Sequence, residues 1–221
     1  MTTTLALDSA GALCSVCLAH DGQRIQRVAN EPRAHANHIL GLVSEVLNTG
    51  GIALEDVERL AFGEGPGGLT GLRIAASVVQ GFALVTGARV VAVSNLTALA
   101  ERVASGVAPG TGVLIAHEAG MGAVCAQWFD VMPEGKPVER STPAVIEVDE
   151  LTWPDGPLVV AGTGSGRLSL PVGCAWFEGE PTAASAADFI LVLDRGGGRE
   201  VSVAAAQPRY LRHPVDGKLA T

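Results

Sequence analysis

The residues best suited to chemistry lie in a glycine-rich loop and at the end of the first predicted strand. Residues 65–73 read GPGGLTGLR and run from a buried strand into a helix whose expected N-cap is Thr70. The free backbone N–H groups at such a helix start suit an anion. Asp8, at a strand end, can position Mg²⁺ or water beside a phosphate. The candidate residues for a bound nucleotide are Asp8, Ser9, Gly65, Gly67 and Gly68.

A purely structural interpretation of these residues stays open. The loop is not a Walker A motif, because no Lys precedes a Ser or Thr after its last glycine, and Pro66 lacks an N–H donor. Its glycines are equally compatible with a tight crossing from strand to helix. For Asp8, a role in forming the turn that follows it is the commoner explanation.

Three other groups of residues have side chains or backbone suited to chemistry. His35 and His38 have the spacing of two metal ligands on a helix, but no third ligand accompanies them, so we interpret them as surface histidines. Residues 162–166 (GTGSG) follow an apolar strand and either contact a phosphate or form an ordinary turn. His117 and Glu118 are adjacent, yet no nucleophile nearby completes a catalytic set.

Composition narrows the class of protein. The chain has 221 residues, a net charge of −8 and only 4% aromatic residues. An acidic chain does not neutralise phosphates, so we expect contact with RNA only inside a complex. No apolar run approaches the roughly 20 residues that cross a bilayer, and the first residues lack the pattern of a signal peptide. The four cysteines form no regular framework, and Cys14 and Cys17, which are three positions apart, fall on opposite faces of a strand. We expect a reduced, cytoplasmic protein.

Hydrophobic periodicity and turn residues predict alternating strands and helices. The predicted strands are 5–8, 13–18, 23–28, 57–63, 89–93, 113–116, 124–131, 144–148 and 158–161. The predicted helices are 34–48, 71–87, 95–104, 166–170 and 183–193. The first three strands, joined by tight turns, should form an antiparallel meander. A glycine-rich stretch at 106–112 predicts a boundary between an N-terminal lobe (1–105), with the glycine loop and the helices over 34–48 and 71–87, and a C-terminal lobe (106–221).

The helix predicted over 71–87 has an unusual distribution of side chains. Its only polar residues are Arg73, Ser77, Gln80 and Thr86, and the rest surround the helix with apolar groups and glycine. A helix that is apolar nearly all round is buried on more than one side. This pattern indicates a lobe centre, a subunit interface, or both. The helix over 34–48 also carries a wide apolar stripe.

Several segments carry a resemblance to a known family. GPGGLTGLR resembles the GPGSFTGLR signature of the bacterial TsaB (YeaZ) family. LALDSAGALCSVCL, RAHANHILGLVSEVL, VVAVSNLTALA and QPRYLRHP are similar to family segments in the same order. The likeness is specific over residues 4–100 and thin over 105–205. Where the family's second lobe usually begins with a strand ending Asp-Ala-Arg, this chain has Ala116-His117-Glu118.

The resemblance implies an α/β, actin/Hsp70-like (ASKHA) two-lobed fold, with mixed sheets flanked by helices. It implies a non-catalytic partner subunit that stabilises the TsaD-like subunit making N6-threonylcarbamoyladenosine in tRNAs reading ANN codons. Such a protein has no catalytic or metal-binding residues and needs no cofactor, although weak ATP or ADP binding is compatible with it. The implied partners are the TsaD-like subunit, a TsaE-like ATPase, tRNA through the complex, and a second copy of the chain in isolation, with no membrane.

The family's interface lies on its first two helices. The residues that match it in this chain are His38, Leu42, Glu45, Val46, Leu72, Arg73, Ala76, Val79 and Gln80.

Two enzyme functions remain as alternatives. One is a stand-alone, ATP-dependent phosphoryl or acyl transferase, in which Asp8, the glycine loop and residues 162–166 surround the nucleotide. Ala116, in place of an acidic residue, argues against it. The other is a glycoprotease-type metallopeptidase, against which the single HxxH argues.

Overall fold

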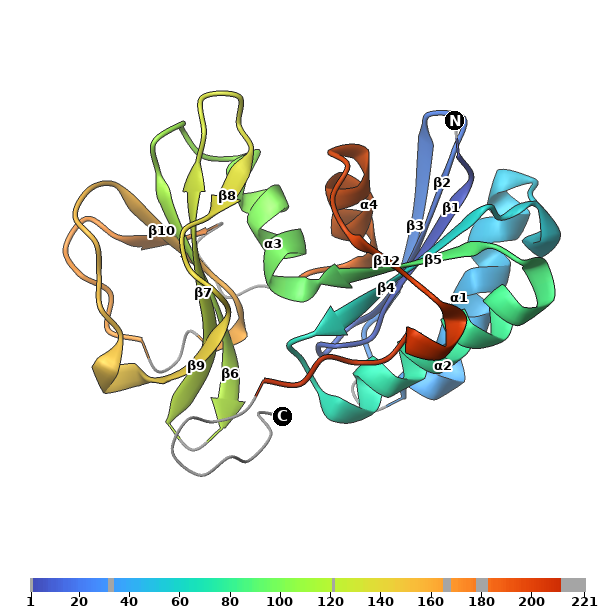
Figure 1. Cartoon of the computed structure of the whole chain (residues 1–221), viewed down its shortest axis with the longest axis horizontal. Coiled ribbons are helices and arrows are strands. Elements are labelled where there is room, and N and C mark those ends of the chain that lie inside the picture. The colour runs from blue at the N-terminus through green and yellow to red at the C-terminus, as the bar shows by residue number, and fades with distance from the viewer. Residues whose placement is uncertain (1, 32–33, 121, 165–167, 178–182, 212–221) are drawn as a thin grey trace. The chain divides into compact units, whose positions relative to one another are not determined.

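The computed structural model describes residues 2–31, 34–120, 122–164, 168–177 and 183–211 (Figure 1). Within them the chain divides into two units. The first runs to Asn95 and resumes from Ser185 to Arg209; the second runs from Leu96 to Ala184 and includes Tyr210 and Leu211. The predicted division after residue 105 is therefore misplaced. A strand near the end of the chain pairs with the first sheet, so the first unit is discontinuous in sequence.

The first unit is built on a six-stranded mixed sheet in the order β12-β5-β4-β1-β2-β3. Its strands are β1 (Thr4–Asp8), β2 (Cys14–His20), β3 (Gln23–Ala29), β4 (Arg59–Gly65), β5 (Arg89–Ser94) and β12 (Arg199–Val201). The first three form the predicted antiparallel meander, whereas β4 runs parallel to β1 and β5 parallel to β4.

Helices cover both faces of this sheet. Helices α1 (His35–Gly50) and α2 (Leu69–Thr86) pack on one face, and α4 (Ala186–Asp194) packs on strands β1, β2 and β4 from the other (Figure 1). Alternate strand residues point to opposite faces, so Leu5 and Leu7 join the core beneath α1 and α2, and Thr4, Ala6 and Asp8 face α4. Helix α1 ends as predicted, with Gly51 in the left-handed conformation (φ 66°).

Helix α2 is more apolar than is needed to pack one of its sides on the sheet. Over its 18 residues the mean hydropathy is 1.4, and a third of them are buried. By length and composition alone this helix could cross a bilayer, so the prediction that no run approaches that length is too strong for α2. Its inner side, with Ala75 and Val79, packs in the core of the first unit as in a core helix.

The second unit holds a smaller mixed sheet in the order β11-β10-β6-β7-β8, with β9 paired to β7. Its elements are α3 (Asn95–Ala104), β6 (Gly112–Gly120), β7 (Ala123–Val131), β8 (Pro137–Glu139), β9 (Ala144–Glu147), β10 (Leu158–Ala161) and β11 (Ala175–Trp176). One side of its core is closed by loops, where Trp128 meets Trp153 edge to face at 5.8 Å between ring centres. Both units combine helices with a mixed sheet, which confirms the predicted α/β class.

The helix predicted over 166–170 is wrong for the residues that the structure describes. Residues 168–170 have no regular structure, and the start of the predicted segment lies outside the described residues. Leu168 and Leu170 both pack on the core of the second unit. Side chains two residues apart share a face in extended chain and not in a helix, so burying both favours the extended form.

Candidate functional site

The glycine loop is packed against the turn that follows β1. Gly68 N donates a hydrogen bond to Ala10 O (2.7 Å), and Ser9 Oγ donates one to Gly71 O (2.8 Å). A Cβ atom on Gly71 would lie 1.7 Å from Ser9 O, and one on Gly67 would lie 2.6 Å from the Cβ of Ala10. The glycines are therefore required because two backbone segments touch.

This contact also moves the start of α2. The helix begins at Leu69 with Gly68 as its N-cap and without a side-chain cap, so the prediction of Thr70 as N-cap is wrong. Gly68 is fixed by its bond to Ala10 O, and the chain turns helical directly after that anchor.

Asp8 lies at the centre of a buried hydrogen-bond network. Its side chain is 2% exposed, and its Oδ1 accepts hydrogen bonds from Asn95 Nδ2 (3.0 Å) and Ala10 N (3.3 Å). Asn95 Oδ1 in turn accepts one from Gly65 N (3.0 Å). The network links the end of β1, the start of the glycine loop and the first residue of α3.

Burial raises the pKa of Asp8 from its usual 3.8 to about 7, and the hydrogen bonds from Asn95 and Ala10 oppose that rise. The nearby carboxylate of Asp188 adds to it. Near neutral pH the Asp8 carboxyl group is therefore partly protonated. It faces the interior of the first unit and is not presented at its surface.

The five predicted nucleotide contacts are thus close together, but their hydrogen bonds go to other residues of the chain, namely Asn95, Ala10 and Gly71. Asp8 and Ser9 are buried, and the N–H groups of Gly65 and Gly68 already donate within the chain. A phosphate on these N–H groups would have to replace internal hydrogen bonds. Binding of ATP or ADP stays a prediction.

The second unit has a comparable turn around His117. Thr163 N donates a hydrogen bond to His117 Nδ1 (3.2 Å), and the Thr163 hydroxyl lies 3.2 Å from the same nitrogen. Burial lowers the pKa of His117 from its usual 6.5 to about 4, so the ring is neutral at pH 7. A Cβ atom on Gly162 would lie 2.0 Å from Ala116 O. The Ala116-His117 pair thus supports the turn after β10; Ser165 and Gly166 lie outside the described residues.

The two histidines of α1 have different surroundings. His38 Nε2 lies 2.6 Å from Glu31 Oε2, whereas His35 is buried at the helix start. Among the residues that the structure describes, no three His, Cys, Asp or Glu side chains gather in a metal-binding arrangement.

Five of the predicted interface residues belong to the core of the chain itself. Leu42, Val46, Leu72, Ala76 and Val79 are at most 8% exposed. Assigning their side chains to a partner surface is therefore wrong. Apolar side chains on these helices pack against the sheet of their own chain, and the sequence pattern alone did not tell which stripe of each helix faces the sheet.

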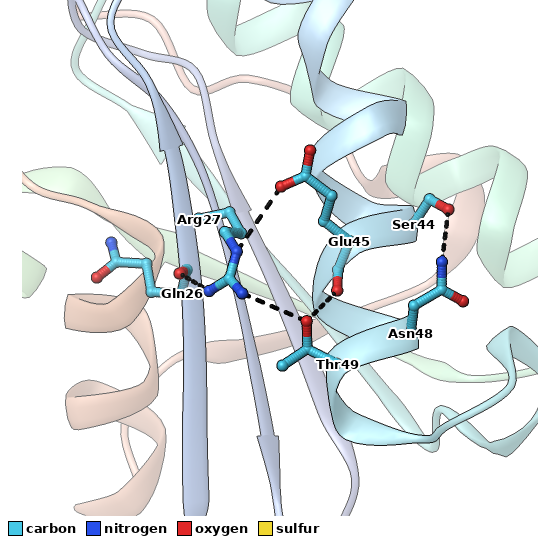
Figure 2. Close-up of polar contacts among 6 residues, drawn as sticks. All are labelled: Gln26, Arg27, Ser44, Glu45, Asn48 and Thr49. Carbon is cyan, nitrogen blue, oxygen red and sulfur yellow. Dashed lines mark hydrogen bonds and ion pairs between the residues drawn. The ribbon is translucent and has the colours of Figure 1, made fainter.

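The other four predicted interface residues are not buried, and they also interact within the chain. Gln80 Nε2 donates to Val203 O (3.0 Å), and His38 pairs with Glu31. Glu45 Oε2 lies 3.7 Å from Arg27 Nε, and Arg27 also donates to Thr49 Oγ1 (3.3 Å), which attaches α1 to β3 (Figure 2). Arg73 is exposed on α2.

The exposed sides of α1 and α2 form an apolar groove that sequence reasoning did not resolve. A cavity of about 410 Å³ is lined by Ala36, Ile39, Leu40, Thr70, Arg73, Ile74, Ser77 and Val78. Leu40 is 55% exposed, and farther along α2 the side chains of Leu84 and Val85 are 77% and 74% exposed. We call this surface, together with Gly41 and Gly81, the helix face.

Two glycines of the helix face have no structural reason in the isolated chain. A Cβ atom on Gly41 or Gly81 would meet no atom within 4 Å, and neither residue has a positive φ. Glycine inside a helix costs about 0.5–1 kcal/mol relative to alanine. The sequence signal was available, because both glycines stand inside strongly predicted helices.

Comparisons with known proteins agree on one family. A sequence model of the TsaD family, tRNA N6-adenosine threonylcarbamoyltransferase, matches residues 27–188. The tRNA threonylcarbamoyladenosine biosynthesis protein TsaB of Escherichia coli is 32% identical over 97% of this chain and 96% of its own length. The TsaB of Haemophilus influenzae is 40% identical over 45% of this chain and 42% of its own.

A solved structure gives the same result. The YeaZ protein from Pseudomonas aeruginosa superposes with a TM-score of 0.83 at 33% identity, covering 96% of this chain and all of that one. At these values the whole fold is shared, including the discontinuous first unit, as the predicted actin-like class implies. The chain belongs to the TsaB (YeaZ) family of tRNA threonylcarbamoyladenosine biosynthesis proteins.

Proposed function

We propose that this chain is a non-catalytic subunit that binds a TsaD-like catalytic subunit through the helix face. The observation that carries the proposal is the exposed apolar surface of α1 and α2, with Leu40, Leu84 and Val85 more than half exposed. An exposed apolar patch of this kind marks an interaction site in a soluble protein.

The helix face suits another helix. On α2 the exposed residues Thr70, Arg73, Ser77, Gly81 and Leu84 follow one another at intervals of three or four, which makes a single stripe along the helix. The exposed small residues of the two helices, which are Ser77 and Gly81 on α2 and Gly41 and Ser44 on α1, leave room for a partner helix to approach closely. Two helices from each protein would form a four-helix arrangement.

The partner's identity is supported by sequence similarity between the two kinds of subunit. A tRNA N6-adenosine threonylcarbamoyltransferase from Maricaulis maris is 37% identical over 78 residues, 34% of this chain. Because the two kinds of subunit are related in sequence, their helix faces should be alike. The two subunits can therefore pair in the way that two copies of one chain pair in a homodimer. In the partner's absence a second copy of this chain would occupy the same face.

The non-catalytic part of the proposal rests on the buried network around Asp8. The Asp8 carboxyl group and the amide of Gly65 both bond to Asn95, and the amide of Gly68 bonds to Ala10 O, so a nucleotide phosphate would have to displace these bonds. We further propose that tRNA reaches this protein only in the complex, since its net charge is −8, that a TsaE-like ATPase acts on the assembled pair, and that the assembly works in the cytoplasm.

The test is to mix the chain with a TsaD-like subunit and measure both complex mass and tRNA modification. The double variant Leu84→Asp, Val85→Asp should weaken the heteromer at least about tenfold, because it places charges in an apolar contact. Val172→Asp is the matched control, as Val172 is a fully exposed apolar residue of the second unit.

Two results would overturn the proposal: no heteromer with the unmodified chain, or a helix-face variant that binds as well as the control. tRNA modification by this chain alone would refute the non-catalytic role. Light scattering of the isolated chain tests the homodimer, which the same double variant should dissociate.

A further inference from the structure

A second cavity lies on the opposite side of the first sheet from the helix face. It measures about 430 Å³ and is lined by Thr2, Thr4, Ala19, His20, Asp21, Gly22, Gln23, Arg24, Arg59, Ile190 and Asp194. Strand register explains its shape. Arg59, Thr4, Ala19 and Arg24 are paired neighbours across β4, β1, β2 and β3, so they form one row on the face that α4 covers.

The floor of this cavity is made of small side chains between two long ones. Thr4 and Ala19 stand in the middle of the row, and Arg59 and Arg24 stand at its sides. Helix α4 ends at Asp194, beside the row, so no helix fills the space above the floor. A cavity of this volume is in the range that accepts a small organic molecule.

Arg59 is a cation without a carboxylate partner in the described part of the chain. Its Nε donates to Thr4 Oγ1 (2.9 Å), which orients the guanidinium and leaves its two terminal nitrogens available. Arg89 is its register neighbour on β5 and is exposed. Two like charges side by side on adjacent strands destabilise a sheet, so this arrangement has a cost within the isolated chain.

The acidic groups at the cavity have other partners. Asp194 pairs with Arg24, and Asp21 lies 3.3 Å from His20 Nε2 with most of its side chain in solvent. His20 Nδ1 is 2.9 Å from Thr3 Oγ1. Gln23 adds an exposed amide at the rim. The unbalanced charge inside the cavity is therefore the positive charge of Arg59.

We propose that this cavity binds a small molecule through a phosphate or carboxylate group held by Arg59. A guanidinium presents two parallel N–H donors that match the oxygens of either group. The cavity lies on the face of the sheet that α4 covers. Because it includes no residue of the helix face, binding there is a function separate from the proposed partner role. Binding would offset the repulsion between Arg59 and Arg89.

The test is a ¹⁵N–¹H NMR titration of the 221-residue chain with inorganic phosphate, AMP, succinate and, as an uncharged control, adenosine. Saturable shifts are expected at the amides of Thr4, Ala19 and Gln23, with a Kd at or below about 1 mM for at least one anion and none for adenosine. Comparing the Kd values of phosphate and AMP with that of succinate shows whether the cavity prefers a phosphate or a carboxylate group.

Arg59→Gln should weaken that binding at least about tenfold, and Arg59→Lys by less, because lysine keeps the charge without the fork. Arg27→Gln is the matched control, since it removes one arginine from the opposite face of the same sheet. Ala19→Val fills the floor and should also abolish binding without changing any charge.

The proposal is overturned if none of the three anions gives saturable shifts at these amides. It is equally overturned if Arg59→Gln and Ala19→Val, each with an otherwise native spectrum, bind as the unmodified chain does.

Discussion

The two units use the same backbone device at their glycine turns and diverge in the side chains around it. In each unit two strands form a hairpin (β1 and β2, or β6 and β7), and a later strand (β4 or β10) runs parallel to the first of them. After that later strand comes a glycine whose position contacts the backbone within or just after the hairpin's first strand. A Cβ atom on Gly71 would lie 1.7 Å from Ser9 O, and one on Gly162 would lie 2.0 Å from Ala116 O. The backbone contact is therefore common to both units.

The two turns differ in the side chain that they hold and in the structure that follows them. In the first unit the turn holds a buried carboxyl group, Asp8, and starts the 18-residue helix α2. In the second a neutral His117 accepts a bond from Thr163 N, and residues 168–170 have no regular structure. A pair of acids facing a nucleotide needs an acidic side chain at the matching point of both turns. Here the first turn has Asp8, which is tied to Asn95, and the second has the neutral His117.

The comparison is tested most severely by adding a methyl group to each turn. Gly71→Ala and Gly162→Ala should each destabilise the unit they belong to by about 4 kcal/mol or more, because the new Cβ would overlap a backbone oxygen. Urea unfolding followed by circular dichroism measures this. Gly68→Ala is the control, since its Cβ would sit 3.3 Å from Ala10 O. Equal stability of Gly71→Ala and Gly68→Ala would contradict the backbone contact.

The second prediction concerns the pH dependence of the first unit. The pKa of Asp8 in the folded chain, about 7, lies above its usual 3.8, so folding takes up a proton. Its contribution to stability is fully present below pH 3.8 and is lost as pH rises through 7, at a cost of up to about 4 kcal/mol. Asp8→Asn keeps an acceptor for Asn95 and should be more stable than the unmodified chain at pH 8.

Amide hydrogen exchange of β1 and β4 at pH 5 and pH 8 measures this effect in the first unit alone. A pH profile that is the same for Asp8→Asn and the unmodified chain would refute the buried, proton-binding carboxyl group.

The second unit should respond to pH in the opposite sense. The pKa of His117, about 4, lies below its usual 6.5, so stability is present above pH 6.5 and falls by up to about 3 kcal/mol as pH drops towards 4. His117→Asn should flatten this fall. Trp128, Trp153 and Trp176 all belong to the second unit, so tryptophan fluorescence during urea unfolding reports on it selectively. A parallel pH response of both units would break the comparison.

The smallest expected effect comes from the hydroxyl group in each turn. Ser9→Ala removes a buried hydrogen bond to Gly71 O and should cost about 1 kcal/mol. Thr163→Val removes the hydroxyl near His117 but leaves the bond from Thr163 N, and Thr163 is exposed, so it should cost less. Thermal unfolding of both variants ranks them, and the reverse order would contradict the assignment.

Local sequence patterns predicted most of the secondary structure, and long-range contacts explain what they missed. The meander, α1 and α2 follow from periodicity and turn residues that lie within a few positions of each other. The bond from Asn95 to Asp8 joins residues 87 positions apart, and nothing near Asn95 indicates it. Burial of Leu72 and Val79 depends on which side of α2 the sheet occupies, which one helix cannot reveal.

The sequence predicted which residues of the candidate site lie close together, but not that their polar groups already have hydrogen-bond partners within the chain. Asp8, Ser9 and the loop glycines do meet, as the family signature implied. That Asp8, Gly65 and Gly68 already have hydrogen-bond partners within the chain depends on Ala10 O and Asn95, which the pattern did not single out. The cavity at Arg59 depends on strand register across four strands, and no short motif encodes it.

The return of α4 and β12 to the first unit has a consequence for biosynthesis. The sheet of that unit stays uncovered on its α4 face, and unpaired along β5, until residues 186–201 have been made. During translation the nascent chain therefore carries an exposed sheet edge while residues 96–184 of the second unit are synthesised, which is when such edges are prone to aggregate. The first unit begins to be synthesised first but stays incomplete until nearly the whole chain has left the ribosome.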